Sequence, residues 1–412
     1  MNAPSNSRVS TARPPAVWLL VVGVVLLAVN LRVAVGVIGP LLPQLRESLS
    51  LTGAQAGLLT ALPTFCFGLL GAAGPTLARK LGPSRTVVAA LAIMTLGQLL
   101  RALIPGDLML FVGSALALAS IAVANVIMPS LVRLYFPGRV AAMTAVYTVL
   151  LSGMSAIVTV IALPLESALG GGWQIGLGAW AAVSAIALLP WIAVSFRDVR
   201  PSAGPALGTL HLRHLARIPK AWVLAAFFGT QSLQAYVVFG WFPTILGDDG
   251  YSQTTAAAYV GLLSLAATVI SMFIPYLLQR LGRPAILIIA LTVSYLLGYA
   301  GLLLAPLSMT WLWCILVGFG TASFPMALFI VTLRARSTEG VLALSGFMQS
   351  TGYIFAGTGV FLFGAVHGSS TNWSAALIGL CVLSVLQLGA ALCSARSWTI
   401  EDELDQRSAA LG

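Results

Sequence analysis

The sequence predicts an all-α integral membrane protein, with twelve transmembrane helices arranged as two pseudo-symmetric six-helix halves. Of its 412 residues, 59% are hydrophobic and only 8% are charged, whereas soluble domains carry about 25% charged residues. Apolar runs of membrane-spanning length recur along the whole chain, and the short alternating segments of a β-barrel are absent. Landmarks repeated at a spacing of 200 residues divide the chain in two.

The individual helices follow from the apolar runs and from the Gly, Pro and charged residues between them. A long polar stretch with five basic residues and two prolines, 196–220, separates the sixth helix from the seventh. We therefore expect an N-terminal half (1–196), a cytoplasmic linker (197–219), a C-terminal half (220–395) and a cytoplasmic tail (396–412). The expected helices are 16–42, 54–77, 84–104, 108–132, 140–165, 173–195, 220–246, 255–279, 284–305, 309–332, 341–366 and 373–395.

The distribution of basic residues predicts the orientation of the chain. If the N-terminus is cytoplasmic, the outer loops keep only Arg46 and, at a helix end, Arg101. Because Lys and Arg collect in cytoplasmic loops, we expect both termini in the cytoplasm of a bacterial-type inner membrane. The net charge of +10 is then a topology signal and does not indicate nucleic-acid binding. The first apolar run lacks a small-residue cleavage site and is expected to be a retained helix.

The two halves share landmarks that stand in the same relation to their helices. Parallel six-helix repeats build a large class of secondary transporters, whose substrate site lies at mid-membrane between the halves. The pairs are Pro43 with Pro243, Pro75 with Pro275, Leu81 and Gly82 with Leu281 and Gly282, and Trp173 with Trp373.

Several short motifs are more specific than composition. They are Asn30-Leu31-Arg32, 39–46, 58–63, 126–130, Phe324-Pro325, 346–349 and Ala356-Gly357. In these stretches the chain resembles the major facilitator superfamily and, within it, the cyanate / 2-nitroimidazole permease family. The resemblance covers essentially the whole chain and implies transport of cyanate or of a nitroimidazole-like ring. One departure is Arg79, which stands where the superfamily's loop signature usually has an aspartate.

Arg32 is the sharpest functional signal. At 1.5 Å per residue it lies roughly 24 Å along a helix from Ala16, within a hydrocarbon core of about 30 Å. A guanidinium there is costly and keeps its proton, so it must face the protein interior or a watery cavity. No Asp or Glu falls inside a predicted helix core. We expect Arg32 to anchor a small anion or polar acceptor group; the alternative is a structural arginine bonded to helix carbonyls or to a neighbouring amide.

Uncharged polar residues complete the expected substrate site. The repeat maps Asn30 and Arg32 onto Thr230 and Ser232, beside two glutamines, while 140–156 aligns with 341–357. Each uncharged candidate has an alternative role as an interhelical hydrogen bond, worth about 1 kcal/mol. Arg101 is expected to snorkel, with an anion-attracting vestibule as the alternative. The expected substrate-binding residues are Arg32, Asn30, Tyr147, Gln231, Gln234, Gln349, Tyr353 and Asn125.

The sequence does not favour an enzyme or a sensor. Its helices contain no paired carboxylates, His/Cys cluster or nucleophile–base motif, and the four cysteines lie at unrelated spacings. A sensor would normally need an output domain, and the loops and tail are too short for one. We expect no cofactor, no metal and no catalytic residue, and a monomer in the lipid bilayer whose partner is a small-molecule substrate.

The expected mechanism is alternating access, in which the halves rock about a midplane site containing Arg32. Proton coupling ordinarily relies on a carboxylate or histidine in a helix core, which is missing here. We therefore expect uniport, exchange, or a proton that travels with the substrate. For the cargo we favour a small anion. The alternative is efflux of a neutral aromatic compound that stacks on Tyr147, Tyr353 and Phe side chains.

Overall fold

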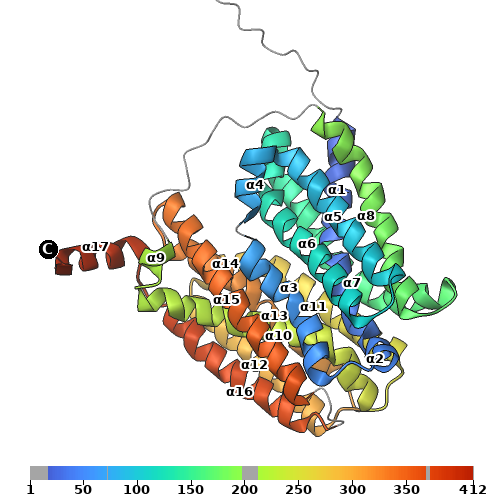
Figure 1. Cartoon of the computed structure of the whole chain (residues 1–412). Coiled ribbons are helices and arrows are strands. Elements are labelled where there is room, and N and C mark those ends of the chain that lie inside the picture. Colours follow the sequence, from blue (N-terminus) through green and yellow to red (C-terminus); the bar gives the residue numbers. More distant parts are fainter. Residues whose placement is uncertain (1–16, 72, 197–211, 368–371, 412) are drawn as a thin grey trace, which may run out of the picture.

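The computed structural model describes residues 17–71, 73–196, 212–367 and 372–411, and these residues are helical apart from short connections (Figure 1). The N-terminal half contains α1 (Val17–Gly36), α2 (Ile38–Leu49), α3 (Gly53–Leu70), α4 (Ala73–Leu81), α5 (Pro83–Leu103), α6 (Asp107–Tyr135), the 3-10 turn η1 (Pro137–Arg139), α7 (Val140–Ala168) and α8 (Trp173–Ser195). The C-terminal half contains α9 (Leu212–Leu215), α10 (Pro219–Asp248), α11 (Gln253–Leu281), α12 (Pro284–Leu304), α13 (Thr310–Thr321), α14 (Ser323–Leu333), α15 (Thr338–His367), α16 (Ser374–Ser394) and α17 (Ile400–Leu411).

Twelve of these segments are long enough to cross a membrane. Within the described residues, 11 spans meet the requirement by length and apolar composition, with α1–α2 and α13–α14 each forming one span. The twelfth is α15, which has 30 residues and is richer in Gly, Ser and Thr. The predicted fold class is therefore confirmed, whereas most of the predicted linker lies outside the described residues.

Breaks within the spans lie four residues before a proline. Proline has no N–H for the carbonyl four residues earlier, and its ring crowds that carbonyl. The carbonyl that Pro40 leaves without its N–H belongs to Gly36, the last residue of α1, and the one that Pro325 leaves belongs to Thr321, the last residue of α13. The break between α3 and α4 lies four residues before Pro75 in the same way. The first span also continues to Leu49 and does not end at 42, because α2 accommodates its internal proline.

The two halves meet along three helix pairs: α3 with α15, α7 with α11, and α2 with α10. We call the end where α1 begins and α16 ends the termini end, and the opposite end the far end (Figure 1). At the far end the Nε1 of Trp241 donates to the Oγ1 of Thr60 across the halves at 3.1 Å. Gly39 of α2 packs directly on the carbonyl oxygen of Phe239 in α10. Both contacts are buried, so the far end is closed in this structure.

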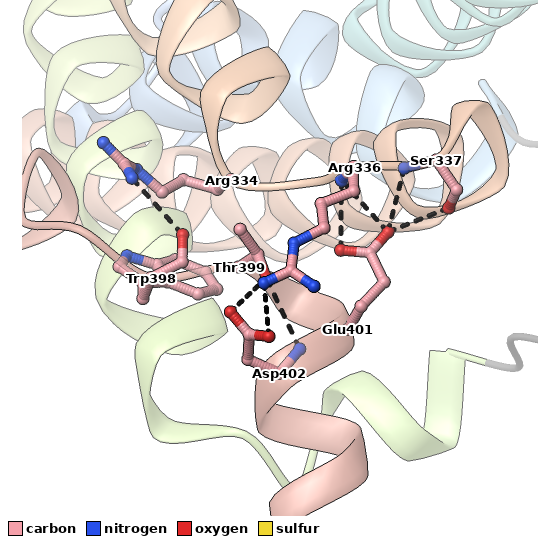
Figure 2. Close-up of polar contacts among 7 residues, drawn as sticks. All are labelled: Arg334, Arg336, Ser337, Trp398, Thr399, Glu401 and Asp402. Carbon is pink, nitrogen blue, oxygen red and sulfur yellow. Dashed lines mark hydrogen bonds and ion pairs between the residues drawn. The ribbon is translucent and has the colours of Figure 1, made fainter.

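At the termini end, the acidic first turn of α17 holds the segment between α14 and α15 (Figure 2). The Glu401 carboxylate accepts hydrogen bonds from the backbone N–H of Arg336 at 3.1 Å and of Ser337 at 3.0 Å, and from the Ser337 hydroxyl at 2.8 Å. The Arg336 guanidinium also pairs with Asp402 at 2.5 Å, and Glu403 pairs with Lys220 at the start of α10 at 2.6 Å. Over its described residues, the predicted tail is therefore docked on the C-terminal half.

Acid should release α17. Burial opposes ionisation of Glu401, but hydrogen bonds from Arg336 and Ser337 outweigh it and lower the pKa of this carboxyl. A lowered native pKa gives stability that is complete above the unfolded value of about 4.3 and is lost as the pH falls through the native value. Hydrogen exchange in 396–411, corrected for the intrinsic pH dependence of exchange, should therefore rise below about pH 4.

The substitution Glu401→Gln should speed exchange of this segment at pH 7 by about tenfold, because hydrogen bonds to a charged group contribute about 1.5 kcal/mol at the low end of their range. Asp405→Asn at an exposed position of α17 is the control and should leave the exchange unchanged. Equal protection in the wild type and Glu401→Gln would show that the carboxylate does not hold the helix.

Candidate functional site: a cavity between the halves

A cavity of about 180 Å³ lies between the two halves. Its walls come from α1, α3, α6 and α7 on one side and from α10, α11, α13, α14 and α15 on the other. Both breaks next to prolines described above contribute, since Gly36 and Thr321 line the cavity. Irregular backbone at membrane depth is tolerated where it lines a cavity of this kind.

Arg32 is the only charged residue among the described residues that line the cavity. It is half-buried on α1, one turn before the break at Gly36. Within the described part of the chain, its guanidinium has no hydrogen bond or ion pair, although it interacts electrostatically with Tyr236 and Tyr353. A guanidinium offers five N–H donors in a fixed fork. The cavity therefore presents a free cationic donor group at its centre.

One flank of the cavity is aromatic and lies along the α3–α15 pair. Phe67 of α3 stacks on Tyr353 of α15 with ring centroids 5.4 Å apart and planes at 28°. Phe228 and Tyr236 of α10 meet Tyr353 edge-on at 4.9 and 6.5 Å. Because Phe67 belongs to one half and Tyr353 to the other, this stack bridges the halves. A flat ring of a ligand can pack against such a surface.

The other flank is built from hydroxyl groups along the α7–α11 pair. We call these six residues the hydroxyl wall: Ser152, Ser155, Thr159, Ser264, Thr268 and Ser271. Sequence reasoning missed this wall. The signal was present, because the spacings i, i+3, i+7 in α7 and i, i+4, i+7 in α11 place each set on one helix face.

Of the eight predicted substrate residues, four line the cavity: Arg32, Asn125, Gln231 and Tyr353. The structure brings these together from α1, α6, α10 and α15. Tyr147 is half-buried on α7 outside the cavity lining. Gln349 also lies outside the lining, and its Nε2 donates to the Ser345 hydroxyl at 2.8 Å.

The remaining two candidates hold helices together away from the cavity lining. Asn30 is fully buried and donates to the carbonyls of Leu26 at 2.8 Å and Val183 at 3.4 Å, which ties α1 to α8. Gln234 donates to Gln387 at 2.6 Å and accepts from Ser384 at 2.8 Å, which ties α10 to α16.

Arg101 departs from the expectation that it snorkels. It is 0% exposed, and its Nη1 lies 3.5 Å from the Ser114 hydroxyl of α6. Gly97 and Gly113 let α5 and α6 approach so closely that the side chain is enclosed between helices. A metal site is not indicated either, because the described residues contain no group of three or more His, Cys, Asp or Glu placed to hold an ion.

Comparison with known proteins gives one consistent family. A sequence model of the Major Facilitator Superfamily matches residues 24–357. The chain is 35% identical over 380 residues to the 2-nitroimidazole transporter of Escherichia coli (strain K12), covering 92% of this chain and 95% of that protein. It is 27% identical over 365 residues to the cyanate transport protein CynX of the same organism, covering 88% and 94%. Its fold matches the crystal structure of the nucleoside transporter NupG with a TM-score of 0.75 at 14% identity, covering 92% of this chain and 100% of that chain.

Proposed function

The chain belongs to the major facilitator superfamily, in the family of the cyanate and 2-nitroimidazole transporters, and from this premise we propose that it moves a small anionic or strongly polar solute across the membrane by alternating access. Arg32 is the central anchor of that solute. The halves rock about the cavity so that the site faces each side in turn. The cargo leaves chemically unchanged.

The observation that carries this proposal is the free guanidinium of Arg32 in the cavity. A cation within a membrane is costly unless it faces a ligand, water or a partner group, and such residues mark substrate pathways. Charge-assisted hydrogen bonds from the arginine fork suit a carboxylate, a nitro group or a small inorganic anion. The basic residues at the termini end, such as Arg79, Lys80 and Arg133, support our placement of both termini in the cytoplasm.

A second candidate function rests on the aromatic flank. The Phe67–Tyr353 stack, with Tyr236 beside it, provides a surface on which a neutral aromatic compound could pack during efflux. In that case the ring would be recognised and Arg32 would have no role in binding.

Counterflow into proteoliposomes separates these two functions. The purified protein is tested with labelled cyanate, benzoate, 2-nitroimidazole and a neutral ring without an acceptor group, such as toluene, against protein-free liposomes. We expect saturable, protein-dependent exchange of solutes with an anionic or nitro group and none of the bare ring. Protein-dependent exchange of the bare ring at a comparable rate would overturn the proposal and favour the efflux function.

A further inference from the structure

Apart from Arg32, the cavity offers more hydrogen-bond acceptors than its own residues can satisfy. We propose that the cargo is a small planar ring that carries an N–H or O–H donor in addition to the acceptor group that Arg32 binds. This inference rests on the proposed function and narrows its substrate class. Three independent features of the cavity surface support it.

The first feature is the hydroxyl wall. Thr159 donates its hydroxyl proton to the Ser155 carbonyl at 2.9 Å, Ser264 donates to Val260 at 2.9 Å, and Thr268 donates to Ser264 at 2.8 Å. A hydroxyl has one proton and two lone pairs. Because these protons are used within their own helices, the three hydroxyls can act toward a ligand only as acceptors.

The second feature is a set of backbone carbonyls without their helical N–H partner. In a helix, proline removes the N–H that would bond the carbonyl four residues earlier. Four residues that line the cavity stand in this position: Gly36 before Pro40, Asn125 before Pro129, Ser271 before Pro275 and Thr321 before Pro325. Unwound or interrupted helices at mid-membrane commonly use such carbonyls in transporter binding sites.

The third feature is Gln231, which lines the cavity and is 1% exposed. Its Nε2 donates to the Ser232 hydroxyl at 2.8 Å, whereas its Oε1 has no partner among the described residues. A buried acceptor without a donor is destabilising, so a donor brought by a ligand would stabilise the loaded protein.

These features choose between the two kinds of cargo that the relatives' names suggest. The cyanate ion has acceptor atoms only, so it could engage Arg32 but would leave the acceptors of the cavity unmet. A 2-nitroimidazole or a hydroxybenzoate has an acceptor group, a flat ring and a donor. The ring has a place against the Phe67–Tyr353 stack, opposite the hydroxyl wall. The inference therefore excludes rings and ions without a donor as high-affinity cargo.

The test uses ligand pairs of equal shape, because a bulky substituent would confuse lost hydrogen bonds with steric clash. 2-Nitropyrrole and 2-nitrofuran differ only in a ring N–H against a ring oxygen. 4-Hydroxybenzoate and 4-fluorobenzoate differ only in O–H against F. Binding to the purified protein in nanodiscs is measured by calorimetry. We expect the donor-bearing member of each pair to bind at least tenfold more tightly; equal affinities within both pairs would overturn the inference.

Variants identify the wall as the reader of the donor. The double substitution Thr159→Val and Thr268→Val keeps shape and should reduce the affinity ratio within each pair toward one. Thr358→Val is the matched control, since Thr358 makes the same bond to a carbonyl four residues earlier on an exposed face of α15. A double variant that weakens both members of a pair equally would contradict the assignment. Arg32→Gln separates the two proposals: if it leaves every affinity unchanged, the proposed function fails, whereas lost binding together with equal pairs overturns only the donor inference.

Discussion

Replacing Arg32 with glutamine should weaken cargo binding by about 10- to 100-fold, because hydrogen bonds to a charged group contribute about 1.5–3 kcal/mol. Counterflow of the cargo should fall at least as far. Arg32→Lys keeps the charge but loses the planar fork, so its affinity should lie between those of the wild type and the glutamine variant. Calorimetry on the purified protein, with 2-nitroimidazole and benzoate as probes, measures all three.

The thermal stability of the same variants tells an anchor from a structural arginine. Within the described residues the Arg32 guanidinium has no bonded partner, so removing its charge should leave the melting temperature equal or higher. A structural arginine would instead lose stability together with binding. Arg280→Gln, at an exposed position near the end of α11, is the control for a general loss of positive charge. Unchanged affinity in Arg32→Gln, or lost binding that merely follows a lower melting temperature, would contradict the anchor role.

The fold could be predicted from sequence because a bilayer leaves few alternatives. Every backbone polar group must be bonded inside the membrane, so apolar runs of sufficient length become helices. The interruptions were also encoded: the breaks after Gly36 and Thr321 follow from Pro40 and Pro325, although the expected helices were drawn through them. Other prolines, such as Pro63 and Pro129, stay inside continuous helices, so tertiary packing decides which proline opens a break.

The candidate site was only partly predictable. Arg32 stands out because a charge at its depth must be explained, and this reasoning needs no neighbours. Gln231 and Gln234 show the limit: they lie three residues apart, so their directions differ by only about 60° around α10. One lines the cavity and the other bonds Gln387 of α16. That choice depends on a helix more than a hundred residues away, which local spacing does not reveal.

A single methyl group at Gly39 should stop the transport cycle. In the closed far end, a Cβ on Gly39 would overlap the carbonyl oxygen of Phe239. Backbone cannot move aside as a flexible side chain does, so Gly39→Ala should exclude this closed arrangement of α2 and α10. Alternating access requires each end to close in turn. We therefore expect counterflow to fall more than tenfold, while binding of 2-nitroimidazole stays near that of the wild type because no cavity residue changes.

The population of open far ends is measured directly with spin labels on the two halves. Ser48 at the end of α2 and Ser252 before α11 are exposed and suit this purpose. Their distance distribution should shift to longer values in Gly39→Ala. Gly379→Ala is the matched control, because a Cβ there meets no atom within 4 Å, and it should keep both transport and the wild-type distances. If Gly39→Ala transports normally with unshifted distances, the contact between Gly39 and Phe239 does not control closure, and the seal must depend on the Trp241–Thr60 hydrogen bond and its neighbours.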